Sequence, residues 1–202
     1  DGRIIMVKVA ILGFGVVGSG VAEVLSGNGA GIQKKADELI EVKYILDVRD
    51  FPDSPFAQHF VKNFSVIEHD PEVNVVVETI GGVGAALDFT ERALKQGKSV
   101  VTSNKELVAT HGRRLLDLAA QNNAVYLFEA SVGGGIPILR PLSECMSANE
   151  ILEICGILNG TANYIFTRMV KDHVPFAEAL AGAQANGYAE QDPSADVEGK
   201  DT

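Results

Sequence analysis

The sequence predicts an α/β fold in which a doubly wound parallel sheet is followed by a second, smaller region. Segments typical of strands and of helices alternate over residues 1–130, and a glycine-rich turn directly follows the first strand. Such alternation folds as a parallel sheet with right-handed crossover connections. The hydrophobic fraction of 46% and the charged fraction of 22% are those of an ordinary folded domain.

The first half of the chain contains five expected strands. Residues 7–12 form a short apolar run, and residues 42–46 form another that is closed by the polar tetrapeptide DVRD. Residues 73–79 (VNVVVET) are almost continuously β-branched, which is typical of a strand buried on both faces of a parallel sheet. The last two strands are expected at residues 99–102 and 124–129.

Helices are expected between these strands. The first begins after the glycine turn and ends among the glycines of residues 27–31, and residues 51–64 contain prolines and are expected to be irregular. Apolar residues at helical spacing predict two further helices, over residues 85–96 and 107–122. The first of these two helices stops before Gly97. These elements assign residues 1–130 to the first domain.

Residues 131–202 are expected to begin a second domain of α+β type. Its expected elements are a glycine-rich loop, a helix, a strand interrupted by Asn-Gly-Thr and a second helix, at residues 133–137, 138–146, 150–166 and 177–186. An acidic segment that contains a proline follows Gly187. Because this segment has no apolar periodicity, we expect the chain to be a fragment whose second domain is truncated.

Composition and charge exclude several classes of protein. Lys and Arg total 17 against 27 Asp and Glu, and the net charge of -10 has the wrong sign for a nucleic-acid partner. The sequence has neither a long apolar run nor a signal-type N-terminus, so we expect a cytoplasmic protein with no membrane segment. Cys145 and Cys155 lie in apolar surroundings without metal-binding spacing and are expected to be buried, reduced thiols.

The turn at residues 13–18 (GFGVVG) carries a specific chemistry. Gly13 allows a tight turn, Gly15 lets the backbone approach a pyrophosphate at a helix N-terminus, and Gly18 lets the helix pack closely on the strand. Because the turn follows a strand and opens a helix, it predicts a dinucleotide cofactor bound to a Rossmann-type domain.

The end of the second strand bears on which dinucleotide binds. Asp47 is placed to accept a hydrogen bond from a ribose 2'-hydroxyl, as in NAD-dependent proteins, and Arg49 is placed to hold a 2'-phosphate, as in NADP-dependent ones. Asp47 and Arg49 together are compatible with either cofactor. Arg49 is also compatible with a solvent-exposed charge of the loop that binds no ligand.

Three other polar features are candidates for binding. Lys105, beside Ser103, follows a strand at the carboxyl edge of the sheet, where ligands of open α/β folds bind. Glu129 precedes a glycine-rich loop whose carbonyls are suited to a cation, although its chemistry alone favours a capping or solvent-facing role. Carboxylates at residues 190–201 fit either a solvated surface or a pocket for a substrate ammonium group.

Six sequence blocks resemble one known family in their order and spacing. They are GFGVVGSG, VVVETIGG, GKSVVTSNKELVA, FEASVGGGIPILRPL, GILNGTANYI and AQANGYAEQDPSADVEGKDT, which begin at residues 13, 75, 97, 128, 156 and 183. The family is that of homoserine dehydrogenase, and the resemblance extends from Val7 to Thr202. It implies a Rossmann-type doubly wound sheet followed by the start of an α+β substrate and dimerisation domain.

The resemblance implies a reaction and a set of site residues. The reaction is reversible, NAD(P)H-dependent reduction of L-aspartate 4-semialdehyde to L-homoserine, at the branch leading to threonine, methionine and isoleucine. At the cofactor, the resemblance implies Phe14, Val16, Val17, Lys105 and Gly187. The turn itself and the strand ends add Gly13, Gly15, Gly18, Arg49, Thr79 and Ser103 to the residues expected there. The expected catalytic and substrate-binding residues are Lys105, Glu190, Asp196 and Asp201. A Na+ or K+ site is implied at Glu129, Val132, Gly134 and Ile136.

One departure from the family pattern keeps alternatives open. The lysine favoured in the family as proton donor follows the Gly-x-Asp-[Ala/Thr] element, and this sequence ends at Thr202 before reaching it. The alternatives are an inactive cofactor-binding fragment of the enzyme, a non-catalytic module that senses NAD(P), and a related acyl-transferring dehydrogenase. The last needs a nucleophilic cysteine and is disfavoured. For the full-length protein the resemblance implies a homodimer or a homotetramer.

Overall fold

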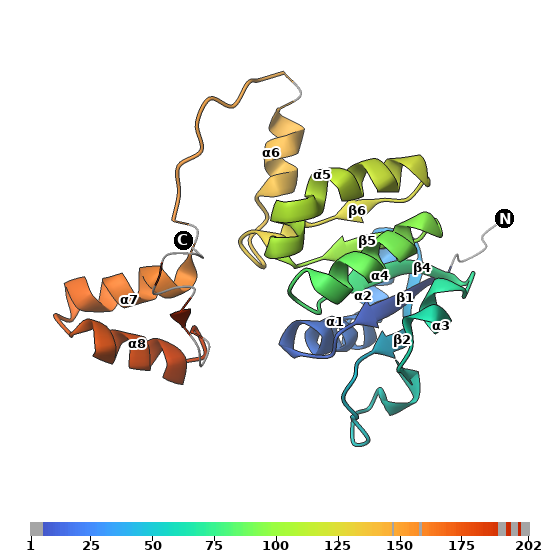
Figure 1. Ribbon diagram of the computed structural model, residues 1–202, viewed down its shortest axis with the longest axis horizontal. Helices are drawn as coiled ribbons and strands as arrows, with labels where there is room; N and C mark the ends of the chain where they lie inside the picture. Colours follow the sequence, from blue (N-terminus) through green and yellow to red (C-terminus); the bar gives the residue numbers. More distant parts are fainter. Residues whose placement is uncertain (1–5, 147, 158, 190–192, 195–197, 199–202) are drawn as a thin grey trace. The chain divides into compact units, whose positions relative to one another are not determined.

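The computed structural model describes residues 6–146, 148–157, 159–189, 193–194 and 198 (Figure 1). It divides into two compact units, the first ending at Ser143 and the second beginning at Glu144. The domain boundary predicted from the sequence lies earlier, between residues 130 and 131. Among the described helices, none is both long and apolar enough to cross a membrane.

The first unit is built on a six-stranded sheet in which every strand pair is parallel. In chain order the strands are β1 (Met6–Leu12), β2 (Leu39–Leu46), β3 (Phe60–Val61), β4 (Val73–Glu78), β5 (Ser99–Thr102) and β6 (Tyr126–Leu127). Their order across the sheet is β3-β2-β1-β4-β5-β6. This is the strand order of dinucleotide-binding folds, and it confirms the predicted fold class.

The register brings four strand ends to one edge of the sheet. Leu12 pairs with Leu46 and with Glu78, and Glu78 pairs with Thr102. The turns that follow β1, β2, β4 and β5 therefore meet at this carboxyl edge. In open α/β sheets ligands bind outside this edge, near the point where the strand order reverses, which here lies between β1 and β4.

Helices cover both faces of the sheet because consecutive residues of its central strands are apolar. Ala10 and Leu12 of β1 belong to one buried cluster, which includes residues from α4 (Gly84–Lys95) and α5 (Lys105–Gln121). Val9 and Ile11 belong to the other, with Ala22 of α1 (Val16–Gly27). Side chains alternate between the two faces of a strand, so a continuous apolar run such as β1 needs a layer on each face.

The first unit differs from the sequence prediction in its connections. The glycine-rich stretch after α1 was expected to be only a break, but it opens a second helix, α2 (Gly29–Ala36), that has no buried residue. Residues 51–64 were expected to be irregular, but η1 (Ala57–His59), the edge strand β3 and the start of α3 (Phe64–Glu68) lie there. These elements are too short to show a hydrophobic periodicity, so pattern reading misses them.

The expected strand at residues 124–129 is only two residues long. Phe128 leaves the extended conformation at φ -140° and ψ 26°, and the 3₁₀ turn η2 (Glu129–Ser131) begins after it. A short helix, α6 (Leu139–Cys145), follows the glycine loop and confirms the helix expected at residues 138–146.

The second unit contains the helices α7 (Gly160–Lys171) and α8 (Phe176–Ala185). They pack through Ile165 of α7 against Ala179 and Ala183 of α8. Helix α8 confirms the helix expected at residues 177–186.

The strand expected at residues 150–166 is wrong. The described residues of 150–157 form no strand, and Asn159 begins a helix because its side chain accepts a hydrogen bond from the Ala162 N–H at 2.7 Å. An asparagine that caps a helix in this way competes with extended structure. Cys145 and Cys155 are both exposed, so the expectation of buried thiols is also wrong. Apolar neighbours in sequence predict burial only where another layer covers them.

Candidate functional site

Two glycines of the turn after β1 are required by the packing of the chain itself. Gly13 has φ +92°, and a Cβ there would lie 2.9 Å from the Thr79 carbonyl oxygen. A Cβ on Gly18 would lie only 2.0 Å from the Gly13 carbonyl oxygen. These glycines therefore make the tight turn and the close contact of α1 with β1 that the sequence predicted.

Gly15 differs from both neighbours, because the fold does not require a glycine there. It precedes α1 with φ -84° and ψ -160°, which any residue adopts, and a Cβ would meet no atom within 4 Å. No side chain caps the N-terminus of α1 at this point. The first N–H groups of a helix have no partner within the helix, so the open space beside Gly15 is suited to an anion.

Asp47 supports this turn from the end of β2. Its Oδ2 accepts a hydrogen bond from the Phe14 N–H at 2.7 Å. Its Oδ1 accepts from the backbone N–H of Arg49 at 2.9 Å, and the Arg49 side chain donates to both oxygens at 3.0 Å. The Arg49 guanidinium and these N–H groups hold the pKa of Asp47 far below its usual range. The sequence predicted a contact with ribose for Asp47, and its contact with the glycine turn was missed.

Arg49 lies at the rim of the same site. Its side chain is 59% exposed beside the buried Asp47 carboxylate, and its guanidinium lies 5.1 Å from the ring centre of Phe51. Lys62 donates to the Arg49 carbonyl oxygen at 2.5 Å and pairs with Asp50 at 2.8 Å. Two cations therefore flank the turn after β2.

A hollow of about 370 Å³ joins these features at the carboxyl edge of the sheet. It is lined by residues of the glycine turn, of the turns after β2 and β4 and of α4, namely Gly13, Phe14, Gly15, Leu46, Asp47, Val48, Arg49, Thr79, Ile80, Ala85 and Phe89. Val16 and Val17 are exposed at the start of α1. The structure thus brings together the predicted residues Gly13, Phe14, Gly15, Arg49 and Thr79.

Thr79 has a structural contact that the sequence did not predict. Its hydroxyl donates to the Leu12 carbonyl oxygen at 2.9 Å, and its Oγ1 is 2.9 Å from where a Gly18 Cβ would lie. The hydroxyl thus ties β4 to the end of β1 and packs under the glycine turn. It lines the hollow but is directed to the protein backbone.

Ser103 and Lys105 lie in the turn after β5. Lys105 is the first residue of α5 and is exposed, and the Asn104 side chain caps this helix by accepting from the Leu107 N–H at 3.0 Å. The strand register places this turn next to the turn after β4. Both residues are therefore at the predicted edge of the sheet.

Glu129 caps the short helix α6. Its Oε1 accepts from the backbone N–H groups of Ile138 at 2.5 Å and Leu139 at 2.9 Å, and its Oε2 accepts from that of Arg140 at 2.7 Å. These N–H groups, with Ile138 first, lower the pKa of Glu129. The capping role that its chemistry favoured is confirmed, and no group of three or more acidic, histidine or cysteine side chains gathers around a metal-sized space among the described residues.

The remaining predicted residues belong to the second unit. Gly187 follows α8 with φ +72°, and the predicted acids Glu190, Asp196 and Asp201 lie outside the described residues. A hollow of about 600 Å³ at the start of α7 is lined by Gly160, Thr161, Asn163, Tyr164, Thr167, Arg168 and Tyr188. The Thr161 hydroxyl donates to the Tyr188 carbonyl oxygen at 2.5 Å. Sequence reasoning missed this hollow, because residues 159–161 were expected to interrupt a strand.

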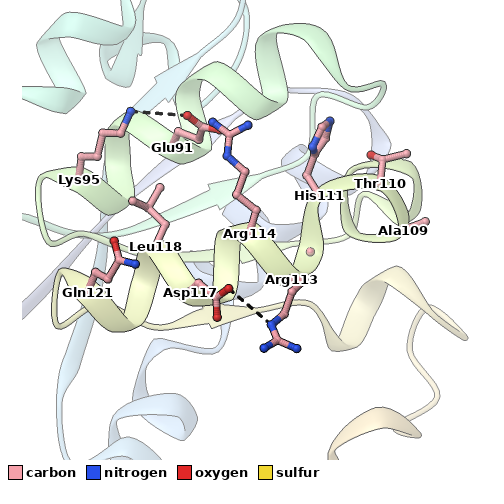
Figure 2. Close-up of a pocket in the computed structure, with 11 residues that line it drawn as sticks. Glu91, Lys95, Ala109, Thr110, His111, Arg113, Arg114, Asp117, Leu118 and Gln121 are labelled. Atoms are coloured by element: carbon pink, nitrogen blue, oxygen red, sulfur yellow. Dashed lines mark ion pairs between the residues drawn. The ribbon is translucent and has the colours of Figure 1, made fainter.

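Another hollow, of about 640 Å³, lies on the outer side of α4 and α5 (Figure 2). Its charged side chains pair with one another: Glu91 with Arg114 at 2.6 Å and with Lys95 at 3.5 Å, and Arg113 with Asp117 at 3.5 Å. None of its lining residues comes from the turns at the carboxyl edge. It is therefore separate from the candidate site.

The strand order, the uncapped helix N-terminus beside Gly15 and the hollow at the carboxyl edge define a dinucleotide-binding domain of the dehydrogenase type. Residues 13–129 match the family model described as "Homoserine dehydrogenase, NAD binding domain", and residues 137–202 match the model described as "Homoserine dehydrogenase". The chain belongs to the homoserine dehydrogenase family.

Individual relatives agree with this assignment. The homoserine dehydrogenase of Bacillus subtilis is 42% identical over 200 residues, which cover 96% of this chain and 46% of the relative. That of Pseudomonas aeruginosa is 42% identical over 196 residues, with 96% and 45% covered. The chain thus spans about half the length of the curated relatives it matches.

Solved structures show the same relationship. A homoserine dehydrogenase from Thiobacillus denitrificans superimposes with a TM-score of 0.87 at 37% identity, covering 98% of this chain and 46% of that one. A hyperthermophilic archaeal homoserine dehydrogenase in complex with NADPH superimposes with a TM-score of 0.83 at 27% identity, covering 98% and 66%.

Proposed function

We propose that this chain forms the cofactor-binding part, and some of the substrate-binding part, of a homoserine dehydrogenase. The proposed reaction is the reversible reduction of L-aspartate 4-semialdehyde to L-homoserine with NAD(P)H, in threonine, methionine and isoleucine biosynthesis in the cytoplasm. The observation that carries the proposal is Gly15, which the fold does not require and which leaves an open space at the N-terminus of α1. A pyrophosphate is the ligand that such a turn accommodates.

Each part of the edge has a role in this proposal. The backbone at Gly13, Gly15 and the start of α1, with Gly18 behind it, holds the pyrophosphate, and Val16 and Val17 border it. The adenosine lies on the β2 side of β1 in this proposal. The turns after β4 and β5, which carry Thr79, Ser103 and Lys105, lie on the opposite side of β1 and border the nicotinamide. When bound, the reduced nicotinamide supplies a hydride to the aldehyde carbon, and the aldehyde oxygen takes up a proton.

The chain also contributes residues toward the substrate. The Lys105 ammonium lies at the carboxyl edge, where a cation stabilises negative charge on the aldehyde oxygen. Glu190, Asp196 and Asp201 are proposed to hold the substrate ammonium group, because carboxylates form strong hydrogen bonds with it. Gly187, before these acids, is proposed to border the cofactor.

We further propose that the site prefers NADP over NAD. Both oxygens of Asp47 already accept hydrogen bonds, so the carboxylate is occupied where NAD-dependent proteins present it to a ribose hydroxyl. Arg49 and Lys62 are both ion-paired, with Asp47 and Asp50, but Arg49 uses only two of its five side-chain N–H donors on Asp47. Its exposed guanidinium can therefore donate further hydrogen bonds to a 2'-phosphate at the same turn. The archaeal relative solved with NADPH is consistent with this preference.

An alkali cation, Na+ or K+, is proposed in the loop after η2. Glu129 would provide a carboxylate oxygen, and Val132, Gly134 and Ile136 would provide backbone carbonyls. Three N–H groups bind the Glu129 carboxylate, which leaves about one of its four lone-pair positions for an ion. Gly133 and Gly134 have φ of +72° and +56°, so the loop turns back on itself and its donor set is chemically suited to such an ion.

The proposed function is tested by NAD(P)-dependent oxidation of L-homoserine, followed at the absorbance of the reduced nicotinamide. The assay compares the 202-residue chain with a version that is extended by the downstream coding sequence. We expect activity in the extended protein, which we also expect to sediment as a homodimer or a homotetramer. An extended protein that binds the cofactor and does not oxidise homoserine would contradict the enzyme function and favour an NAD(P)-sensing module.

A further inference from the structure

Glu78, the last residue of β4, is a fully buried carboxylate that the proposed function does not use. Its Oε1 accepts a hydrogen bond from the Ile80 N–H at 2.8 Å. Its Oε2 accepts from the Thr102 hydroxyl, at the end of β5, at 2.6 Å. Burying a carboxylate is costly unless its oxygens are hydrogen-bonded, so a specific arrangement compensates for its burial.

The hydrogen bonds continue from Thr102 into the next turn. The Thr102 Oγ1 accepts from the Asn104 N–H at 2.9 Å. The Asn104 side chain caps α5 through the Leu107 N–H and donates to the Gly82 carbonyl oxygen at 2.6 Å. Side-chain hydrogen bonds therefore join the end of β4 and the turn after it to the end of β5 and the turn after that, through Glu78 with Thr102 and through Asn104 with Gly82.

This network lies directly behind the residues that face the cofactor in the proposed function. Thr79 and Ile80 line the hollow, and Ser103 and Lys105 flank Asn104 on the other turn. The network does not include Gly15 or Arg49, which lie toward the pyrophosphate and the adenosine. Its hydrogen bonds therefore join the two turns on the side of β1 where the proposed function puts the nicotinamide.

Another buried polar group lies beside Glu78. Tyr126, on β6, is 3% exposed, and its hydroxyl has no hydrogen-bond partner among the described residues. Burial and the nearby Glu78 carboxylate raise the pKa of Tyr126. The Tyr126 phenol therefore stays neutral beside the Glu78 carboxylate.

We propose that Glu78 is a positioning residue, which holds the turns after β4 and β5 in the arrangement that receives the nicotinamide. This inference rests on the proposed function and adds a residue that does not touch the ligand. An apolar residue would fill the same space but would leave the Ile80 N–H and the Thr102 hydroxyl without partners.

The test compares two ligands of the full 202-residue chain, NADPH and 2'-phospho-ADP-ribose, which lacks the nicotinamide. Kd values from isothermal titration calorimetry give the ratio of the two affinities. The variants are Glu78→Gln and Thr102→Val, and the matched control is Thr90→Val. Thr90 is also fully buried, and its hydroxyl has no partner among the described residues.

We expect the wild type to bind NADPH more tightly than the nicotinamide-free ligand. Glu78→Gln and Thr102→Val should weaken NADPH binding about 5- to 10-fold, the effect of about one hydrogen bond, and change 2'-phospho-ADP-ribose binding less than about twofold. Thr90→Val should change neither affinity. A thermal unfolding scan of each sample confirms that the variant is folded.

Three results would overturn the proposal: a wild-type affinity ratio of one, variants that bind both ligands as tightly as the wild type does, or an equal loss of affinity for both ligands. The last would mean that Glu78 only stabilises the domain. A wild type that binds neither ligand would instead contradict the cofactor site on which the proposed function rests.

Discussion

Substitutions at the glycines of the turn after β1 can separate an effect on cofactor binding from an effect on folding. A methyl group on Gly18 would lie 2.0 Å from a carbonyl oxygen, whereas a side chain on Gly15 would meet no protein atom within 4 Å. Gly18→Ala should therefore damage the protein, and Gly15→Val should damage only the ligand site. The two effects are measurable on the same samples.

The expected magnitudes follow from these contacts. In Gly18→Ala, α1 must move away from the turn, and such overpacking costs about 1–3 kcal/mol against a gain of up to about 1 kcal/mol in helix propensity. A net loss of about 1–2 kcal/mol lowers the unfolding midpoint by about 2–8 °C at this chain length. In Gly15→Val, the loss of one or two hydrogen bonds to the pyrophosphate, at about 1.5–3 kcal/mol each, weakens binding at least about 10-fold.

The assay combines a fluorescence titration with NADPH and a thermal unfolding scan. Gly20→Ala is the control, because Gly20 lies in α1 and a Cβ there also meets no atom within 4 Å. We expect Gly15→Val to unfold within about 1 kcal/mol of the wild type, since only the preference for glycine at a helix N-cap is lost. Wild-type affinity for NADPH in Gly15→Val would refute the assignment of this turn to the pyrophosphate.

Three further predictions concern charges. Arg49→Ala should weaken the binding of NADPH about 10-fold or more and that of NADH much less, because only NADPH has a 2'-phosphate. The control, Arg113→Ala, removes a side chain that is 90% exposed on α5 and should change neither affinity. Equal losses of affinity for NADPH and NADH in Arg49→Ala would contradict the NADP preference. The unfolding midpoint should be higher in K+ or Na+ than in choline at equal ionic strength, because a cation that binds only the folded protein stabilises it. Glu129→Gln should abolish this difference in midpoint. A difference that persists in Glu129→Gln would exclude Glu129 as a ligand. Lys43 lowers the pKa of Asp70 from 3.8 to about 2, so the pair stabilises the fold by up to about 2 kcal/mol above pH 4, and this is lost as the pH falls from about 4 to 2. Asp70→Asn should remove that stabilisation at neutral pH and reduce the dependence on acid, and an unchanged acid unfolding curve would contradict the pairing.

Much of the first unit could be predicted from local patterns. The β-branched run of β4 and the apolar run of β1 identify buried parallel strands, and GFGVVG between a strand and a helix predicts a pyrophosphate turn. These signals lie within a few neighbouring residues, so they can be read without knowing the partners. The strand expected at residues 150–166 failed because apolar residues before Asn159 resemble a strand, while the helix cap at Asn159 depends on a hydrogen bond that composition does not reveal.

By itself, the sequence determined the fold class, the dinucleotide turn and the family resemblance, because each depends on residue types at short, regular spacing. Only the tertiary structure decided which glycine the fold does not require, since the contacts of Gly18 and Gly15 depend on how closely α1 packs on β1. It also decided that Asp47 binds Phe14 and Arg49, and that Glu78 meets Thr102. The physical reason is that hydrogen-bond partners on neighbouring strands are selected by strand order and register, and these depend on the packing of the whole sheet.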